Sequence, residues 1–247
     1  MEEQEWDLVA DTFDEHILDV PRHDRRGKIL QAVRLHGGRR KVAADLGCGI
    51  GRTIPMLAGH FGRVQALDIS RHCLRRAERT HARFHHVAYH HADLSRELPF
   101  APVDFVLCIN VLLIAARAKR QAMLDNVCAS VKPGGHLLLV TPAVESALYA
   151  THRLVQLYEA DGMKPATAQR KAARDTTRMD MGVVVVNGTP TKHFLKEELA
   201  DLLVQRGMKV KDIKKIEYPW NYALADAPPD MAPPMPWNWM ALAERVP

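Results

Sequence analysis

The fold of this 247-residue chain is decided by the stretch Val42-Ala43-Ala44-Asp45-Leu46-Gly47-Cys48-Gly49-Ile50-Gly51-Arg52. An apolar run ends in a carboxylate, three alternating glycines follow, and Thr53 to His60 then has helical character. A buried parallel strand that turns through glycines into a helix brings backbone N–H groups close to a ligand. A Cβ would block that approach, and such a turn requires positive φ angles. The stretch therefore predicts a strand–turn–helix unit that binds a ligand.

A second apolar run, Val64 to Leu67, ends in Asp68, about twenty residues after the glycines, where an acid can bind a ribose diol. The third glycine follows the second by two positions, so the GxGxxG spacing of dinucleotide sites is absent. The carboxylate of Asp45 would repel a pyrophosphate but suits a cationic amino-acid group. These features oppose an NAD-dependent oxidoreductase.

Asp45 to Gly51 resembles the first motif of the class I S-adenosylmethionine (SAM)-dependent methyltransferases, and Ala66-Leu67-Asp68-Ile69-Ser70 resembles their second. The segment His91-Ala92-Asp93-Leu94 resembles the motif in which an acid accepts the adenine amine. The resemblance implies SAM as cofactor and S-adenosylhomocysteine as product. The cofactor residues that it implies are Asp45 for the ammonium group; Gly47, Cys48 and Gly49 for the methionyl part; Asp68 for the ribose hydroxyls; Asp93 for the adenine amine; Ile69 and Leu94 for the faces of the adenine; and Asn110 beside the sulfonium.

Strands and helices alternate, which predicts an α/β fold with a parallel sheet covered by helices on both faces. The expected strands are Val42–Leu46, Arg63–Leu67, Phe84–Tyr89, Val103–Ile109, His136–Thr141, Met208–Glu217 and Trp237–Arg245. The expected helices among them are Thr53–Gly59, Ser70–His81, Ala118–Val131 and Lys196–Arg206. Seven strands with the last one reversed, in a doubly wound Rossmann-like sheet, is also what the resemblance implies.

We expect a single methyltransferase domain over 1–247, made of four parts. These are an N-terminal helical lid (1–40), a SAM-binding half (41–142), an inserted lid (143–192) and a C-terminal helix and strand hairpin (193–247). The inserted lid should contain one or two helices between Val144 and Arg178, and a β excursion from Met181 to Phe194 that turns at Asn187-Gly188.

The composition is that of a soluble globular protein, with 47% hydrophobic and 26% charged residues. Four scattered cysteines, without a CxxC pair, are expected to be reduced and mostly buried, which favours a cytoplasmic location. The N-terminus lacks a signal-peptide core, and the longest apolar stretch, Val103 to Ala116, is too short to span a membrane. These features predict no membrane role.

The net charge of +5 comes from clusters of Arg and Lys such as Arg22 to Lys28. Aromatic residues do not alternate with these clusters, so solvated helix faces are favoured over a nucleic-acid surface. The histidines between His81 and His91 fall on both faces of a short strand, without ligand spacing for zinc, and no metal site is predicted.

The absence of the Asn-Pro-Pro-Tyr signature after the fourth strand, and of an exposed nucleophilic cysteine, points to a small metabolite as methyl acceptor. We expect transfer to one of its O, N or S atoms by in-line displacement. The candidate substrate-binding residues are Trp6, Phe13, His16, Tyr149 and Trp220, and the candidate catalytic residues are His193, as a base, and Tyr218.

Two alternatives stay open at this point: an RNA methyltransferase that uses the arginine clusters, and a catalytically silent SAM-binding partner subunit. The chain is expected to be a monomer or a homodimer.

Overall fold

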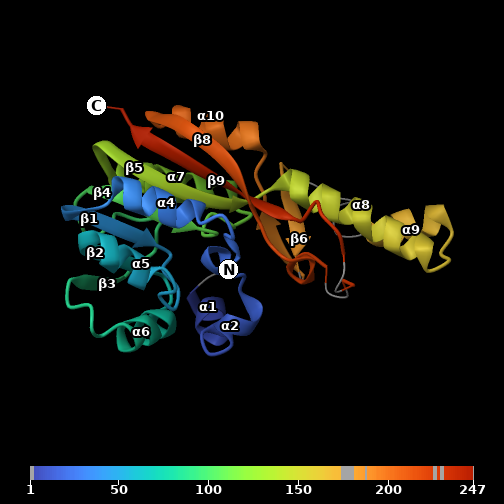
Figure 1. The fold of residues 1–247 in the computed structure, drawn as a ribbon, viewed down its shortest axis with the longest axis horizontal. Coiled ribbons are helices and arrows are strands. Elements are labelled where there is room, and N and C mark those ends of the chain that lie inside the picture. Colours follow the sequence, from blue (N-terminus) through green and yellow to red (C-terminus); the bar gives the residue numbers. More distant parts are fainter. Residues whose placement is uncertain (1–2, 174–180, 187, 225–226, 229–230, 247) are drawn as a thin grey trace.

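In the computed structural model, the described residues are 3–173, 181–186, 188–224, 227–228 and 231–246. The centre is a seven-stranded sheet of order β3-β2-β1-β4-β5-β9-β8, in which only β9 runs antiparallel to its neighbours (Figure 1). Its strands are β1 (Gly38–Leu46), β2 (Phe61–Asp68), β3 (Val87–His91), β4 (Val103–Ile109), β5 (Val131–Pro142), β8 (Met208–Glu217) and β9 (Trp237–Arg245). The predicted seven-stranded sheet with a reversed last strand is confirmed.

Helices cover both faces of this sheet, and each face has its own hydrophobic core. On one face lie α4 (Lys28–His36), α5 (Ile54–His60) and α6 (Arg71–Thr80), and on the other α7 (Arg117–Ala129) and α10 (Lys196–Val204). In β5, Leu137 and Leu139 belong to one core while Leu138 and Val140 belong to the other. Because the central strands are buried on both sides, their sequences are continuous apolar runs.

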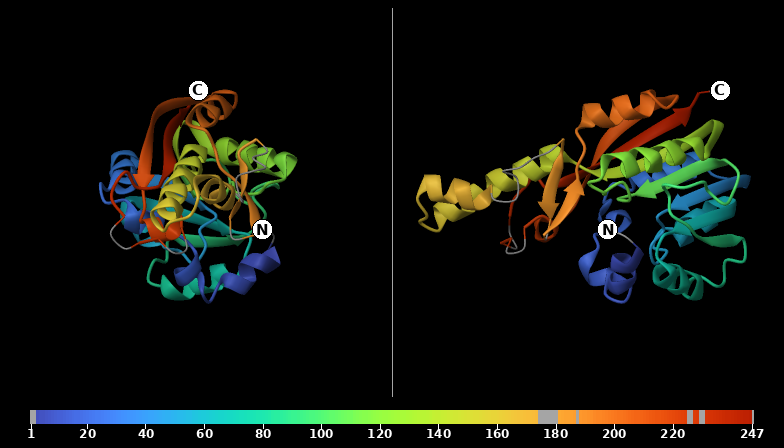
Figure 2. Two further views of the ribbon diagram at one scale, coloured as in Figure 1. Left: turned by 90° about the vertical axis from the view of Figure 1, so that its right-hand side faces the viewer. Right: turned by 180° about the vertical axis from the view of Figure 1, so that it is seen from behind.

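The remaining elements gather at the carboxyl ends of the strands or extend beyond them (Figures 1 and 2). They are α1 (Glu3–Val9), α2 (Phe13–His16), α3 (Val20–His23), α8 (Val144–Ala160), α9 (Pro165–Ala172), the hairpin of β6 (Val183–Val186) and β7 (Thr189–Lys192), and the short 3₁₀ helix η1 (Trp220–Tyr222). Helices α8 and α9 pack on each other and project away from the sheet as an arm (Figure 2). In the view of Figure 1, the first three helices lie below the carboxyl ends of β1 and β2.

The structure differs from the predicted elements mainly where the strands begin. β5 begins at Val131, because Val131 pairs with Val103 before Lys132 to Gly135 and pairing resumes between His136 and Phe105. Helix α7 ends at Ala129, before Pro133, and the Pro-Gly-Gly segment forms an irregularity inside the strand. β3 begins at Val87, three residues after its predicted start. Arg178, where the predicted helices of the insertion end, and Asn187, in its predicted turn, lie outside the described residues.

All four cysteines are free and buried, as predicted. No helix among the described residues is long and apolar enough to cross a bilayer.

Candidate cofactor and acceptor cleft

The glycine turn after β1 adopts a backbone that excludes other side chains. The φ angles of Gly47, Gly49 and Gly51 are +76°, +53° and +86°. A Cβ on Gly47 would lie 2.3 Å from Cγ2 of Val111, and one on Gly49 would lie 2.8 Å from Cζ of Phe13. Both glycines are thus required by conformation and by close packing. The turn is tied to the sheet by the N–H of Gly47, which donates to the carbonyl of Leu67 over 2.7 Å.

Asp68, the last residue of β2, has a buried and firmly oriented carboxylate. Its Oδ2 accepts the N–H of Gly49 over 2.7 Å, and its Oδ1 accepts the N–H of Ser70 over 2.8 Å. Burial raises the pKa of Asp68, while these backbone donors act in the opposite direction. An ionised carboxylate offers about four lone-pair positions, more than these backbone donors use, so Asp68 can also accept from a ligand.

Asp45, at the end of β1, is only 3% exposed, and its Oδ2 accepts the hydroxyl of Thr53. Burial raises the pKa of Asp45 to about 7, because the ionised form loses its hydration; the hydrogen bond from Thr53 opposes this rise, and the charge of Asp68 adds to it. A cationic ligand group beside Asp45 would favour the ionised carboxylate.

Asp93, beyond the end of β3, lies in the same cleft and is half-buried. Its Oδ1 accepts the N–H and the hydroxyl of Ser95 over 2.9 and 2.8 Å, and its Oδ2 lies 3.4 Å from Nζ of Lys119. Burial alone would raise the pKa of Asp93, but the bonds from Ser95 and the charge of Lys119 lower it. Ile69 and Leu94 line the cleft beside it.

Asn110 follows β4 in a left-handed conformation, with φ of +53°. Asparagine tolerates this region better than most side chains. Its Oδ1 lies 3.4 Å from Nδ2 of the buried Asn238 on β9, and its N–H donates to Val140 over 2.9 Å. Asn110 is therefore held between β4, β5 and β9 at the floor of the cleft.

Two segments outside the sheet form the walls of the cleft. The N-terminal segment contributes Trp6, Phe13, Ile17, Leu18, Asp19, Val20 and Pro21. The β6–β7 hairpin contributes Thr189, Pro190 and Thr191, and the N–H of Lys192 anchors it by donating to Leu113 over 2.8 Å. Most of the lining side chains away from the glycine turn are apolar.

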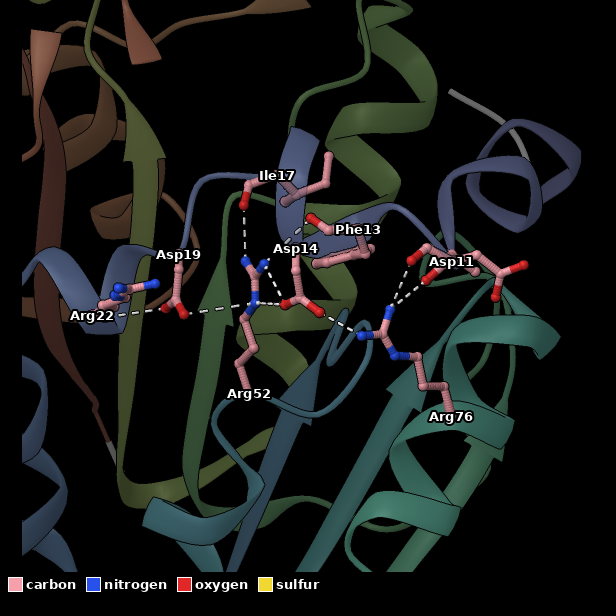
Figure 3. A network of polar contacts seen from close by, with 9 residues as sticks. Asp11, Phe13, Asp14, Ile17, Asp19, Arg22, Arg52 and Arg76 are labelled. Atoms are coloured by element: carbon pink, nitrogen blue, oxygen red, sulfur yellow. Dashed lines mark hydrogen bonds and ion pairs between the residues drawn. The ribbon is translucent and has the colours of Figure 1, made fainter. Parts of the chain in front are cut away.

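Two arginines of the cofactor half attach the N-terminal segment (Figure 3). Arg52 donates to Asp14 and to the carbonyl of Ile17, each over 2.9 Å, and its guanidinium lies 5.0 Å from the ring centroid of Phe13. Arg76 of α6 also bonds Asp14, and it donates to the carbonyl of Ala10 over 2.7 Å. Asp14 thus bridges the arginine after the glycine turn and the arginine of the following helix.

Residues 43–135 match the sequence model of the methyltransferase domain family, a span that contains the glycine turn, Asp45, Asp68, Asp93 and Asn110. This part of the chain is therefore similar to a methyltransferase domain. A search of curated protein sequences finds no match.

Solved structures with the same fold include several methyltransferases. The N-methyltransferase NodS from Bradyrhizobium japonicum WM9, in complex with S-adenosyl-L-homocysteine, aligns with a TM-score of 0.62 at 15% identity, over 98% of this chain and 97% of NodS. The magnesium protoporphyrin IX methyltransferase ChlM from Synechocystis PCC 6803, with bound SAM, aligns with a TM-score of 0.58 at 13% identity, over 92% and 81%. A complex of the Haloferax volcanii Trm112 methyltransferase activator with a putative methyltransferase aligns with a TM-score of 0.63 at 16% identity, over 98% of both chains. At these identities the similarity concerns the fold.

The structure brings most of the predicted site residues into one cleft. They are Asp45, Gly47, Cys48, Gly49, Asp68, Ile69, Asp93, Leu94 and Asn110, with Trp6 and Phe13 of the predicted acceptor set. Burial raises the pKa of the Cys48 thiol, so it lines the cleft in the neutral form.

Tyr149, Trp220, His193 and Tyr218 lie outside the cleft lining. Tyr149 and Trp220 pack together in a separate cluster at the base of the α8–α9 arm, with ring centroids 5.7 Å apart. Burial lowers the pKa of His193 to about 4, and its Nδ1 faces the carbonyl of Thr191 at 3.1 Å. Burial raises the pKa of Tyr218 to about 12. The side chain of His16 lies outside the described part of the chain. The roles assigned to these five residues stay predictions.

Sequence reasoning missed several cleft residues. Thr53 could have been noticed as a hydroxyl at the start of the helix after the glycine turn, and Arg52 as a charge at the turn itself. Asp19 and Lys119 carry no local signal, because they reach the cleft only through the packing of distant segments.

Proposed function

We propose that this chain transfers the methyl group of SAM to an O, N or S atom of a small metabolite. The observation that carries the proposal is the carboxylate of Asp68. It is buried at the end of β2, it is oriented by the N–H groups of Gly49 and Ser70, and it lines the cleft as an acceptor for a ribose hydroxyl.

The other cleft residues fit the remaining parts of this cofactor. Gly47 and Gly49 allow close approach of the methionyl part, Asp45 suits its ammonium group, and Asp93 offers an acceptor for the adenine amine. Ile69 and Leu94 supply apolar surface for the ring. NodS and ChlM, which share the fold, have been crystallised with S-adenosyl-L-homocysteine and SAM respectively.

A small acceptor is supported by the walls of the cleft. The N-terminal segment and the β6–β7 hairpin both contribute to the lining, so the space beyond Asn110 is bounded on two sides. Its apolar lining, with the polar groups of Asp19, Asn110 and Thr191, suits an acceptor that has an apolar body and few polar atoms.

The cofactor, when bound, supplies an already activated methyl group, so the task of the protein is alignment. Asn110, held by Asn238 and by the backbone of β5, orients groups at the floor of the cleft. Phe13 and Ile17 of the N-terminal segment line the cleft with apolar side chains, which exclude water from it. If a base acts, His193 is the candidate from the sequence, but its pKa of about 4 makes it a weak proton acceptor at neutral pH.

The cofactor assignment is tested by Asp68→Ala and Asp68→Asn. We expect Asp68→Ala to weaken binding of S-adenosylhomocysteine at least tenfold, about 1.4 kcal/mol, because bonds to a charged acceptor are lost. Asp68→Asn keeps the shape of the side chain and should lose less affinity for S-adenosylhomocysteine. Isothermal titration calorimetry measures both, and Asp212→Ala on the exposed side of β8 is the control. Unchanged affinity in Asp68→Ala would remove Asp68 from the site.

The acceptor class is tested by adding methyl-labelled SAM and the protein to cell extract and sorting the label into small-molecule, protein and RNA fractions. Label in the small-molecule fraction supports the proposal, and mass spectrometry then identifies the acceptor. Label in RNA would favour the alternative of an RNA methyltransferase. Binding of SAM without label in any fraction would favour a silent partner subunit.

A further inference from the structure

A second cavity, of about 450 Å³, lies outside the cofactor cleft. It is formed by the turn between α3 and α4 on one side and by the carboxyl end of β8 on the other. Since the share of liquid volume of one water molecule is about 30 Å³, the cavity can hold a group many times larger than water.

The charge of this cavity is strongly positive. Its lining includes the cationic residues Arg25, Arg26, Lys28 and Lys214 and the two acids Asp24 and Glu217, while Lys215 offers its carbonyl to Lys28. The carboxylate of Asp24 is already engaged, because its Oδ2 accepts the N–H of Ile29 over 2.7 Å.

Some of these cations are held in place by the protein itself. Nζ of Lys28 donates to the carbonyl of Lys215, and the ammonium of Lys215 lies 3.4 Å from the ring centroid of Trp237. Lys214 pairs with Asp212, which does not line the cavity. Arg25 and Arg26, in contrast, are exposed, and neither guanidinium group makes a hydrogen bond or ion pair within the described part of the chain. The two guanidinium groups are therefore available to an anion.

The cavity and the cofactor cleft share helix α3 as a wall. Val20 and Pro21 at the start of α3 line the cleft, and His23 at its end lines the cavity. Nε2 of His23 is buried without a hydrogen-bond partner among the described residues. Because β8 runs parallel to β1–β5, its carboxyl end lies on the same edge of the sheet as the cleft.

We propose that this basic cavity binds a phosphate group of the methyl acceptor, so that the substrate is a phosphorylated small molecule reaching both sides of α3. The assignment of the phosphate to the acceptor rests on the proposed function. Guanidinium groups match phosphate with paired hydrogen bonds, which makes Arg25 and Arg26 the main contacts.

A phosphorylated small molecule fits the cavity better than single-stranded RNA does. Sequence-tolerant RNA surfaces combine charge with exposed aromatic rings on which bases stack. The aromatic side chains of this cavity are His23 and Tyr218; His23 packs edge-on against Tyr222, and the hydroxyl of Tyr218 interacts with Ser146. Both residues are partly buried, so the cavity offers no exposed aromatic side chain for stacking.

The phosphate site is tested by calorimetry with inorganic pyrophosphate and the full chain saturated with S-adenosylhomocysteine. We expect the double variant Arg25→Ser/Arg26→Ser to bind pyrophosphate at least fivefold more weakly than wild type. The matched control is Arg39→Ser/Arg40→Ser, which removes two exposed arginines at the start of β1 on the opposite edge of the sheet and should bind like wild type. Equal affinities in all three proteins, or no binding by wild type, would overturn the proposal.

The two proposals fail separately. Affinity for S-adenosylhomocysteine is measured for each variant and should not change. If wild type does not bind S-adenosylhomocysteine, the proposed function is wrong, regardless of the result for pyrophosphate binding. The methylated product from cell extract should bind an anion-exchange column and lose retention after phosphatase treatment. A product insensitive to phosphatase would overturn the phosphorylated acceptor. If the protein binds RNA through Arg25 and Arg26 but does not bind pyrophosphate, the cavity is a nucleic-acid surface and the proposed phosphate site is wrong.

Discussion

At the scale of the residue, Asp45 and Asp68 dominate the electrostatics of the cleft. Both are buried at the ends of adjacent parallel strands, and each raises the cost of ionising the other. Asp68 receives two backbone N–H bonds, whereas Asp45 receives one hydroxyl from Thr53. Asp45 is thus the carboxylate that depends most on a ligand for its charge.

Binding of S-adenosylhomocysteine should release protons near neutral pH. The pKa of Asp45 is about 7 without ligand, so about half of the molecules carry its proton at that pH, and an ammonium group beside it would expel the proton. Affinity should rise between pH 6 and pH 8, and Asp45→Asn should remove most of this dependence. Calorimetry in buffers of different ionisation enthalpy measures the proton count. If Asp45→Asn releases the same number of protons on binding, another group is the source of those protons.

At the scale of the element, the N-terminal segment is bound to the cofactor half through polar contacts and through an apolar cluster that includes Ala10, Phe13, Ile50 and Cys73. Asp14 joins Arg52 and Arg76, while Phe13 packs on Gly49 (Figure 3). The side chain of Asp14 is 56% exposed, so its ion pairs contribute little to global stability. Such a segment can open without unfolding the sheet.

Deletion of residues 1–20 should reduce turnover more than affinity for S-adenosylhomocysteine. The deletion removes one wall of the acceptor space but leaves Asp45, Asp68 and the glycine turn in place. Calorimetry measures the loss of affinity for S-adenosylhomocysteine, and a methyl-transfer assay measures the loss of turnover. Equal loss of both would indicate a structural role for the segment.

Asp14→Asn should loosen the segment selectively. We expect amides of residues 10–23 to exchange with solvent several-fold faster, while the melting temperature changes little. Hydrogen exchange followed by mass spectrometry measures this, with Asp161→Asn at the end of α8 as control. Unchanged exchange would show that apolar packing of Phe13 is sufficient.

At the scale of the whole molecule, stability should depend on pH through buried groups of opposite sign. Burial and the neighbouring His136 lower the pKa of His36 to about 4, with the two rings stacked at 3.7 Å between centroids. The unfolded chain binds the proton of His36 more readily, so this group adds stability as pH rises from about 4 to 6.5. Asp45, whose folded pKa is about 7 against 3.8, removes stability as pH rises between those values.

The two contributions can be separated by substitution. Relative to wild type, Asp45→Asn should make the unfolding free energy rise more steeply between pH 4 and 6.5, and His36→Phe should make it rise less steeply or fall. Each difference is bounded by about 1.4 kcal/mol per pH unit. Urea denaturation at several pH values measures the slopes. Parallel curves for all three proteins would contradict both assignments.

The strands could be predicted well because each has a local signal. The bounds predicted for β4, β8 and β9 are those of the structure, since β4 and β9 are mainly apolar runs and β8 combines spaced apolar residues with charged ones after Gly207. The start of β5 was missed, because Pro133 and the two glycines after it resemble a break although the chain pairs with β4 on both sides of them.

The amino-acid sequence by itself determined the cofactor half of this protein. Gly47, Asp45 and Asp68 lie at the ends of consecutive parallel strands, and the right-handed crossover between such strands brings those ends together. Only the tertiary structure decided the acceptor side. Phe13 reaches Gly49, Thr191 reaches Ile114, and Arg25 reaches the end of β8, through packing between segments far apart in the chain. Those contacts depend on how the walls close over the sheet, which no local pattern encodes.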